Sequence, residues 1–378
     1  MKEFRVTLET VTPMFLGGAE PRPTKDGKGM PELRPPSVRG AMRYWFRALI
    51  GGIYGDEEKE KIQEIERHVF GGAAEKDTSH ASQVAIRIEN QNLKELKKYE
   101  KIKAKNGKAL FPPAGRDYLY WSMDQSGSAQ KGNLLNARYY IPPESSFDLY
   151  MTFKSMVAPE IIMKYAVYSF WLAVELGGIG ARSRRTAGSL SIYNGEMAYL
   201  PKSLQIGTKK NIADQLGRAI SFIRETLNTE KIIPNINLPS KFDVLHPSVC
   251  KIWILGVAES SDSIVKAIGE KMQMYRSHTP VDQNKNTWLL ERSVFGMPIK
   301  GLKGPERRSS PLWLKVSKVD NYYVGFATLF KSQLLPNGEK LGYEDSGGER
   351  HFKSPADYGI VENWVRKSFA DAMEVVYD

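Results

Sequence analysis

The chain carries one order of predicted strands and helices twice, and this repeated order is what most restricts its fold. The first copy begins with an alternating strand at Phe4 to Val11 and a helix at Val38 to Ile50, which we expect Ser37 to cap and Gly51-Gly52 to end. A second long helix begins at Pro159, a residue suited to a first turn. The predicted elements of this copy are 4–11, 38–50, 56–69, 84–88, 146–154, 159–176 and 189–193.

The second copy follows a predicted connector that contains a helix at 210–227. Its predicted elements are 249–257, 261–275, 311–318, 322–331 and 364–375. Strand, helix, two strands, helix and strand is the ferredoxin-like order, and the second copy matches it without a clear last strand. A short echo supports the relation between the copies, because Arg67-His-Val-Phe-Gly71 and Arg292-Ser-Val-Phe-Gly296 each end a predicted helix.

The pattern therefore predicts an α+β fold of two tandem ferredoxin-like (βαββαβ, RRM-like) domains. The N-terminal domain spans residues 1–200 and contains a long irregular insertion at about 90–140. Residues 201–240 form a connector, and residues 241–378 form the C-terminal domain. A chain of 378 residues is long enough to give both domains a substantial core.

The charge balance favours an anionic partner. Lys and Arg number 54 against 43 Asp and Glu, which gives a net charge of +11. The single cysteine, Cys250, excludes an intrachain disulfide framework and lies in an apolar run, so we expect a buried, inert thiol. The first residues enter an alternating pattern directly, and no window approaches 18 apolar residues. These features predict a cytoplasmic protein without a membrane-spanning segment.

A glycine-rich, arginine-rich segment follows the second long helix and reads G-G-I-G-A-R-S-R-R-T-A-G-S-L from Gly177 to Leu190. Exposed peptide N–H groups and guanidinium groups both bind phosphate oxygens. The alternative is a helix C-cap followed by an ordinary loop. The segment is neither a Walker motif nor a dinucleotide fingerprint, because no G-K-[ST] closes it and it follows a helix. The ligand that this segment predicts is a polyanion, and specifically a nucleic acid. The predicted contacts with RNA are Gly177, Gly178, Gly180, Arg182, Arg184 and Arg185.

A second basic element lies on the first predicted helix. Arg39, Arg43 and Arg47 are spaced i, i+4, i+8 and therefore share one helix face, while Trp45 belongs to the apolar side and is expected in the core. Three like charges in a row repel one another unless an anion lies across them. The row therefore predicts a phosphate-binding face, with all three arginines as RNA contacts. The alternative is that each arginine pairs with a carboxylate of a neighbouring element. Ser37 lies at the helix start, where free N–H groups also attract anions.

The ferredoxin-like topology places the start of the first helix and the end of the second near one side of the sheet, so we expect the two basic elements to line one groove. Other candidate contacts with single-stranded RNA are Lys25, Lys28, Arg34, Arg307 and Arg308. Aromatic rings stack on bases, although most of the available rings are expected in the core. The available rings are Tyr44, Trp45, Tyr118, Tyr120, Trp121, Tyr139 and Tyr140.

Catalytic and metal motifs are absent from the sequence. The five histidines are scattered without metal-ligand spacing, and no G-x-S-x-G elbow occurs. We therefore expect no cofactor and no metal. A metal-free ribonuclease needs only one suitable base, so His278 and His351 remain candidates for such chemistry.

Four segments together resemble one known family. These are P-E-L-R-P-P-S-V-R-G-A-M-R-Y-W-F-R at 31–47, R-H-V-F-G at 67–71, G-G-I-G-A-R-S-R-R at 177–185 and R-R-S-S-P-L-W-L at 307–314. They resemble the first subunit of the Cmr complex, the type III-B CRISPR RNA-silencing effector, within the RAMP superfamily of ferredoxin-like RNA-binding proteins. The resemblance implies two ferredoxin-like domains that face each other and a subunit at the end of the assembly that holds the 3′ side of the guide.

The resemblance also implies antiviral RNA binding without a nuclease centre in this subunit. The sequence is thus interpreted as a non-enzymatic subunit that binds guide RNA, target RNA or both, and that contacts other Cmr subunits. Two alternatives stay open. One is a metal-independent CRISPR endoribonuclease of the same superfamily, and the other is a purely structural scaffold subunit.

Overall fold

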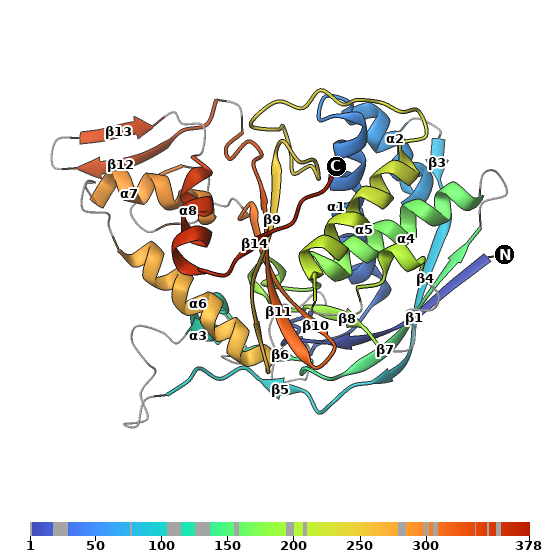
Figure 1. Ribbon diagram of the computed structural model, residues 1–378, viewed down its shortest axis with the longest axis horizontal. Helices are drawn as coiled ribbons and strands as arrows, with labels where there is room; N and C mark the ends of the chain where they lie inside the picture. Colours follow the sequence, from blue (N-terminus) through green and yellow to red (C-terminus); the bar gives the residue numbers. More distant parts are fainter. Residues whose placement is uncertain are drawn as a thin grey trace.

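Two four-stranded antiparallel sheets organise the protein (Figure 1). The structure is a computed structural model, and it describes residues 2–17, 29–75, 78–103, 115–124, 137–154, 159–193, 200–206, 210–278, 285–297, 299, 302–304, 309–336, 338–345, 348–352 and 357–378. The strands of the first sheet are β1 (Lys2–Thr10), β4 (Val84–Asn92), β7 (Ser146–Phe153) and β8 (Leu190–Ile192). Those of the second are β9 (Cys250–Ala258), β10 (Leu312–Val319), β11 (Tyr322–Phe330) and β14 (Met373–Glu374).

The two sheets share one strand order. It is β4-β7-β1-β8 in the first sheet and β10-β11-β9-β14 in the second, so each sheet runs second, third, first, fourth in chain order. The helices that connect first to second and third to fourth strands are α1 (Pro35–Tyr54), α4 (Pro159–Glu175), α6 (Ser261–Ser277) and α8 (Gly359–Ser368). The protein is therefore a mixed α+β fold with antiparallel sheets, as the sequence predicted.

Shorter elements complete the chain. The helical ones are α2 (Lys59–Phe70), α3 (Gly115–Leu119), η1 (Ser183–Arg185), η3 (Lys202–Leu204), α5 (Ile212–Leu227), α7 (Lys285–Glu291) and η4 (Arg292–Phe295). The other strands form three two-stranded antiparallel sheets, β2 (Gly72–Glu75) with β3 (Thr78–His80), β5 (Lys97–Lys98) with β6 (Tyr139–Tyr140), and β12 (Leu341–Asp345) with β13 (Gly348–Phe352).

The elements stack in four layers that alternate between helices and sheets. Figure 1 shows α6 and α8 on one side, then the second sheet, then α1, α4 and α5, and finally the first sheet. Side chains of β10 and β11 confirm that the second sheet is buried on both faces. Trp313 and Phe330 belong to the core cluster that contains α1, whereas Leu314 and Leu329 belong to the cluster beneath α6.

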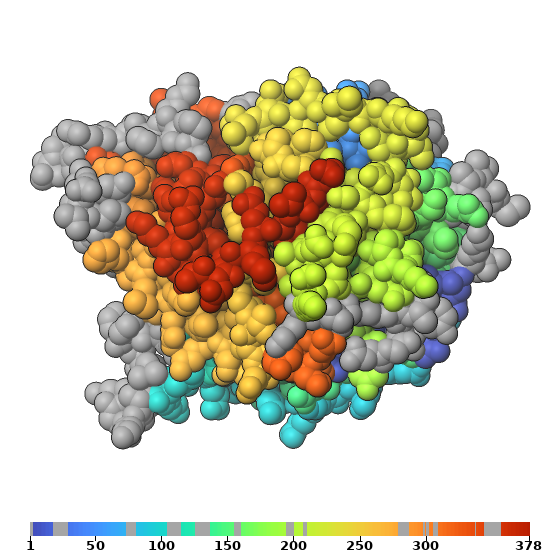
Figure 2. All heavy atoms as spheres, in the orientation of Figure 1, coloured from blue at the N-terminus to red at the C-terminus, as the bar shows by residue number. Residues whose placement is uncertain are grey.

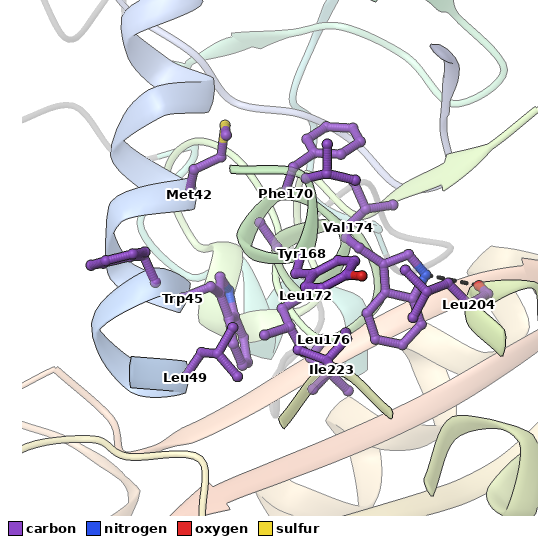
Figure 3. Packing of buried hydrophobic residues seen from close by; sticks show 14 of the residues in the cluster. Met42, Trp45, Leu49, Tyr168, Phe170, Leu172, Val174, Leu176, Leu204 and Ile223 are labelled. Carbon is purple, nitrogen blue, oxygen red and sulfur yellow. Dashed lines mark hydrogen bonds between the residues drawn. The ribbon is translucent and has the colours of Figure 1, made fainter. Parts of the chain in front are cut away.

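The central helical layer is packed by large apolar side chains. Figure 3 shows Trp45 and Leu49 of α1 beside Leu172 of α4 and Leu176, which directly follows α4, and all four are fully or almost fully buried. The expectation that Trp45 belongs to the core is confirmed, since its exposed fraction is 0%. Cys250 is also buried, and burial raises the pKa of its thiol to about 12.

Helix α1 is longer than its sequence pattern suggested. It begins at Pro35 with Arg34 at the N-cap position, so Ser37 lies inside the first turn and is not the cap. It continues through Gly51 and Gly52 to Tyr54 and ends at Gly55, whose φ is 105°. The paired glycines permit close packing, because a Cβ on Gly52 would lie under 3.0 Å from the carbonyl oxygen of Leu245.

The predicted helix at 364–375 was misplaced. Helix α8 ends at Ser368, and β14 pairs with β9 to supply the last strand of the second sheet. The residues that follow alternate, with Val375 and Tyr377 buried and Val376 80% exposed, which is the period of an extended chain. Figure 2 shows this C-terminal segment crossing the surface beside α5. A Cβ on Gly217 of α5 would lie under 3.0 Å from the carbonyl oxygen of Val376.

The described part of the predicted insertion packs on the second half of the chain. Helix α3 lies against α6, and a Cβ on Gly269 of α6 would lie under 3.0 Å from the carbonyl oxygen of Gly115. Side chains extend the contact, because Arg276 donates to the hydroxyl of Tyr118 at 2.8 Å. The hydroxyls of Tyr120 and Thr186 lie 3.0 Å apart, which also ties the insertion to the glycine-rich loop.

Candidate nucleic-acid interface

The glycines of the glycine-rich loop are used for packing inside the protein. Gly177 and Gly178 are buried, and a Cβ on Gly177 would lie under 3.0 Å from the Nε1 atom of Trp45. Gly180 is exposed, yet its φ is 96° and a Cβ there would lie under 3.0 Å from the carbonyl oxygen of Phe15. The close approach expected for a ligand is thus, at these positions, an approach by the protein's own side chains and backbone.

Two arginines of this loop donate hydrogen bonds within the protein. Arg185 donates to the carbonyl oxygens of Phe295 and, at 3.2 Å, of Leu312. Burial, and then the neighbouring charge of Arg276, lower the pKa of Arg185 to about 9. Arg182 donates to the Ser122 hydroxyl at 3.0 Å, and burial also lowers its pKa. Both side chains hold the loop against the second sheet and the insertion.

Arg184 is the arginine of the loop that reaches a cavity. Its guanidinium lies over the rings of Tyr44 and Trp313, with its central carbon 5.0 Å and 4.6 Å from the ring centres. It also pairs with Asp243 at 3.4 Å and donates to the carbonyl oxygen of Ser310. Its side chain is 21% exposed, so the outer edge of the guanidinium remains accessible.

A hydrogen-bond network fixes the rings beneath Arg184. The Tyr44 hydroxyl donates to Asp243 at 2.7 Å and accepts from Trp313 Nε1 at 2.9 Å. The same carboxylate accepts from the Ser332 hydroxyl at 2.5 Å. Burial raises the pKa of Tyr44, and the charge of Asp243 raises it as well. The network joins Tyr44 of α1 and Arg184 of the loop to three places in the second half. These are Asp243 before β9, Trp313 in β10 and Ser332 after β11.

The arginines of α1 are partly neutralised by the chain itself. Arg43 Nε lies 2.5 Å from the buried Glu66 carboxylate of α2, and Arg47 lies 3.5 Å from the same oxygen. Arg39 donates to the carbonyl oxygen of Val84 at 3.2 Å. Burial and then the charge of Arg43 lower the pKa of Arg39. The alternative of carboxylate pairing therefore holds for Arg43 and Arg47, although 48% of the Arg47 side chain stays exposed.

One pocket of about 460 Å³ brings the two basic elements together. Arg47 of α1 and Arg184 of the loop both line it, and Lys241 adds a third cation. The other predicted contacts of the helix and the loop are not among its lining residues. The rest of the lining is Tyr44, Phe242, Asp243, Gln333, Leu334, Leu335 and Pro336. Cations and apolar side chains therefore meet in one cavity, a combination suited to a ligand with anionic and apolar parts.

Comparisons with known proteins identify the family. The RAMP superfamily model matches residues 7–191. The Cmr subunit Cmr1-2 of Pyrococcus furiosus is 31% identical over 196 residues, which cover 51% of this chain and 96% of that protein. This chain belongs to the Cmr1 family of the RAMP superfamily. The Cmr1-1 subunit of the same organism is 29% identical over 314 residues, or 81% of this chain and 82% of the relative.

Solved structures agree with the Cmr1 family at the level of the fold. The crystal structure of Cmr1 from Pyrococcus furiosus matches with a TM-score of 0.63 at 23% identity and covers 100% of this chain and 99% of its own. A chain in the cryo-EM structure of a type III-B Cmr-beta complex bound to cognate target RNA matches with a TM-score of 0.51 at 14% identity, covering 96% of this chain and 98% of its own.

Among the described residues of this Cmr1-family chain, the remaining candidates are not part of the pocket lining. Arg34 donates to the carbonyl oxygen of Gly17 at 3.1 Å, and Ser37 lies partly buried in the first turn of α1. His278 is exposed directly after α6, and the side chain of His351 in β13 lies outside the described residues. Lys25, Lys28, Arg307 and Arg308 also lie outside the described residues.

Sequence reasoning missed the pocket residues that lie between the two halves. Lys241 and Asp243 follow the connector, and Gln333 to Pro336 follow β11, so no motif or period joins them to α1. Within the described residues, no group of three or more His, Cys, Asp or Glu side chains is placed to hold a metal ion. A search of the same residues finds no helix long and apolar enough to cross a membrane.

Proposed function

We propose that this protein is a non-catalytic RNA-binding subunit of a type III-B Cmr effector complex, that it binds the 3′ side of guide RNA, target RNA or both, and that its role is antiviral. The observation that carries the proposal is the pocket in which Arg47, Arg184 and Lys241 converge from three separate segments. Membership of the Cmr1 family, whose relatives are Cmr subunits, supports the assignment to such a complex.

The same proposal includes two tandem ferredoxin-like domains at residues 1–200 and 241–378. Their support is the shared strand order, second-third-first-fourth, with a helix between the first and second strands and another between the third and fourth. The echo noted in the sequence ends an α-helix in the first half and forms a 3-10 helix in the second, and its apolar residues are buried in both. Val69-Phe70 and Val294-Phe295 are buried, and the glycines that follow, Gly71 and Gly296, have φ values of 77° and 105°.

Phosphate binding at this pocket follows from the surplus of accessible cations. Asp243 is already engaged by Tyr44, Ser332 and Arg184, and Lys241 pairs with the exposed Glu57. The lining of the pocket still holds three cations, Arg47, Arg184 and Lys241, against the single carboxylate of Asp243. Guanidinium groups bind phosphate through paired N–H donors, which suits RNA better than a neutral ligand.

Titration of fluorescent single-stranded RNA at several salt concentrations tests RNA binding. We expect log affinity to fall with log salt at a slope of roughly −2 to −5, because each neutralised phosphate of single-stranded RNA contributes about −0.7. A flat response, or no binding, would favour the scaffold alternative, in which the basic surfaces contact acidic subunits. Incubation of RNA with the protein, with Mg²⁺ or with a chelator, tests the endoribonuclease alternative. Cleavage that disappears in His278→Ala or His351→Ala would overturn the non-catalytic assignment.

A further inference from the structure

Among the described residues, glycines inside the helices permit close contacts with other parts of the chain, with one exception. Among the described residues, a Cβ on Gly51, Gly52, Gly217 or Gly269 would lie under 3.0 Å from another part of the chain. Gly40 lies in the interior of α1, is exposed, and has no described atom within 4 Å of the place its Cβ would occupy. Glycine destabilises a helix relative to alanine, and no described atom packs closely enough at Gly40 to explain that cost.

Gly40 shares the helix face that leads to the pocket. Residues four and seven positions along a helix lie on the same side, so Tyr44 and Arg47 follow Gly40 on one face of α1. Both of these residues line the pocket between the halves. Four residues of helix rise about 6 Å, which places Gly40 one turn before the cavity. The bare backbone and the pocket are therefore parts of one continuous surface.

The charges around this surface select its occupant. Arg39 and Arg43 flank Gly40, and Arg47, Arg184 and Lys241 lie at the pocket. A protein segment that needed close contact with a helix would be favoured by apolar neighbours, whereas a phosphodiester backbone is favoured by cations beside a place without a side chain. The arrangement is complementary to a polyanionic strand.

We propose that Gly40 is the point at which the sugar–phosphate backbone of single-stranded RNA lies against α1, and that the strand continues into the pocket, where Arg47, Arg184 and Lys241 hold its phosphate groups. This inference rests on the proposed function as an RNA-binding subunit. It adds a steric requirement to the electrostatic one. A methyl group at residue 40 would separate the strand from the helix while leaving every charge in place.

The test compares Gly40→Ala with Lys241→Ala and with Gln63→Ala, an exposed, charge-conserving substitution on α2. Thermal unfolding and the salt dependence of RNA affinity are measured for each. We expect Gly40→Ala to unfold at a higher temperature than wild type, yet to bind single-stranded RNA about tenfold more weakly with an unchanged salt slope. Lys241→Ala should instead make the slope shallower by about 0.7, because one phosphate contact is lost. Gln63→Ala should bind as wild type does.

The outcomes separate this inference from the function on which it rests. If wild type binds RNA and Gly40→Ala binds it equally well, the contact at Gly40 is wrong while the RNA-binding function stands. If Gly40→Ala keeps its RNA affinity but fails to assemble with the other subunits, a protein lies on α1 and the inference is overturned. If wild type itself does not bind RNA, both the proposed function and the inference are wrong.

Discussion

Arg43 and Glu66 form an ion pair at 2.5 Å in which the arginine is partly exposed and the carboxylate is buried. The side chain of Glu66 is only 4% exposed, against 36% for Arg43. The pair joins α1 to α2, so Arg43, one of the three arginines on this face of α1, stabilises the fold. Arg47, 3.5 Å from the same oxygen, is the more accessible arginine.

The pair predicts different effects for two neighbouring arginines. Arg43→Ala removes the main partner of a buried carboxylate and should lower the free energy of unfolding by about 1–3 kcal/mol. Arg47→Ala removes a longer, more exposed contact and should cost less than about 1 kcal/mol. Urea unfolding monitored by circular dichroism measures both. Equal stabilities of the two variants would contradict the role assigned to Glu66.

Arg184→Ala should weaken RNA binding about fivefold to tenfold, which corresponds to about 1 kcal/mol for a lost charge-assisted contact. Loss of the stacking on Tyr44 and Trp313 should also lower stability by about 1 kcal/mol. Arg184→Lys keeps the charge but not the planar group, and should recover only part of the affinity. Fluorescence anisotropy with labelled RNA is the measurement, and full affinity in Arg184→Ala would remove this residue from the interface.

Trp45→Ala should be among the most destabilising single substitutions. Its ring is fully buried and packs against Tyr44, Trp313 and Phe330, with ring centres 5.5 Å, 5.5 Å and 5.9 Å away. Truncation of such a side chain costs about 3–5 kcal/mol. Trp121→Ala, at a tryptophan that is 43% exposed, is the matched control and should cost much less. Thermal unfolding of both variants decides the comparison.

His246 predicts a loss of stability at mildly acidic pH. Burial, and then the charge of Arg224, lower the pKa of His246 to about 4 from 6.5. Between these two values the unfolded chain binds a proton that the folded chain does not, so stability falls as pH falls from about 6.5 to about 4. His246→Gln should reduce that fall, while His278→Gln, at an exposed position, should leave it as in wild type. Urea midpoints across this pH range provide the readout.

The sequence predicted the local features better than the contacts between distant segments. The period-2 pattern placed β1 and the spacing of Arg39, Arg43 and Arg47 placed them on one helix face, because both depend only on neighbours along the chain. The pairing of Arg43 with Glu66 and the position of Lys241 depend on tertiary packing, which no spacing reveals.

The glycines show the same division. Their presence in the loop after α4 was read as an open backbone, but sequence alone does not show which atoms occupy the space beside a missing Cβ. The structure places Trp45 beside Gly177 and the backbone of Phe15 beside Gly180. The strand β14 was missed because a pairing of two residues is too short to produce a period.

The contact between Gly115 and Gly269 also has a consequence for synthesis of the chain. Residues around Gly115 are translated long before α6, so the surface on which α3 packs does not yet exist when α3 leaves the ribosome. The first sheet can form before α6 is made, whereas the surface of α3 that packs on α6 has no partner until the second half is synthesised. The docking of α3 is therefore coupled to the synthesis of α6, about 150 residues later in the chain.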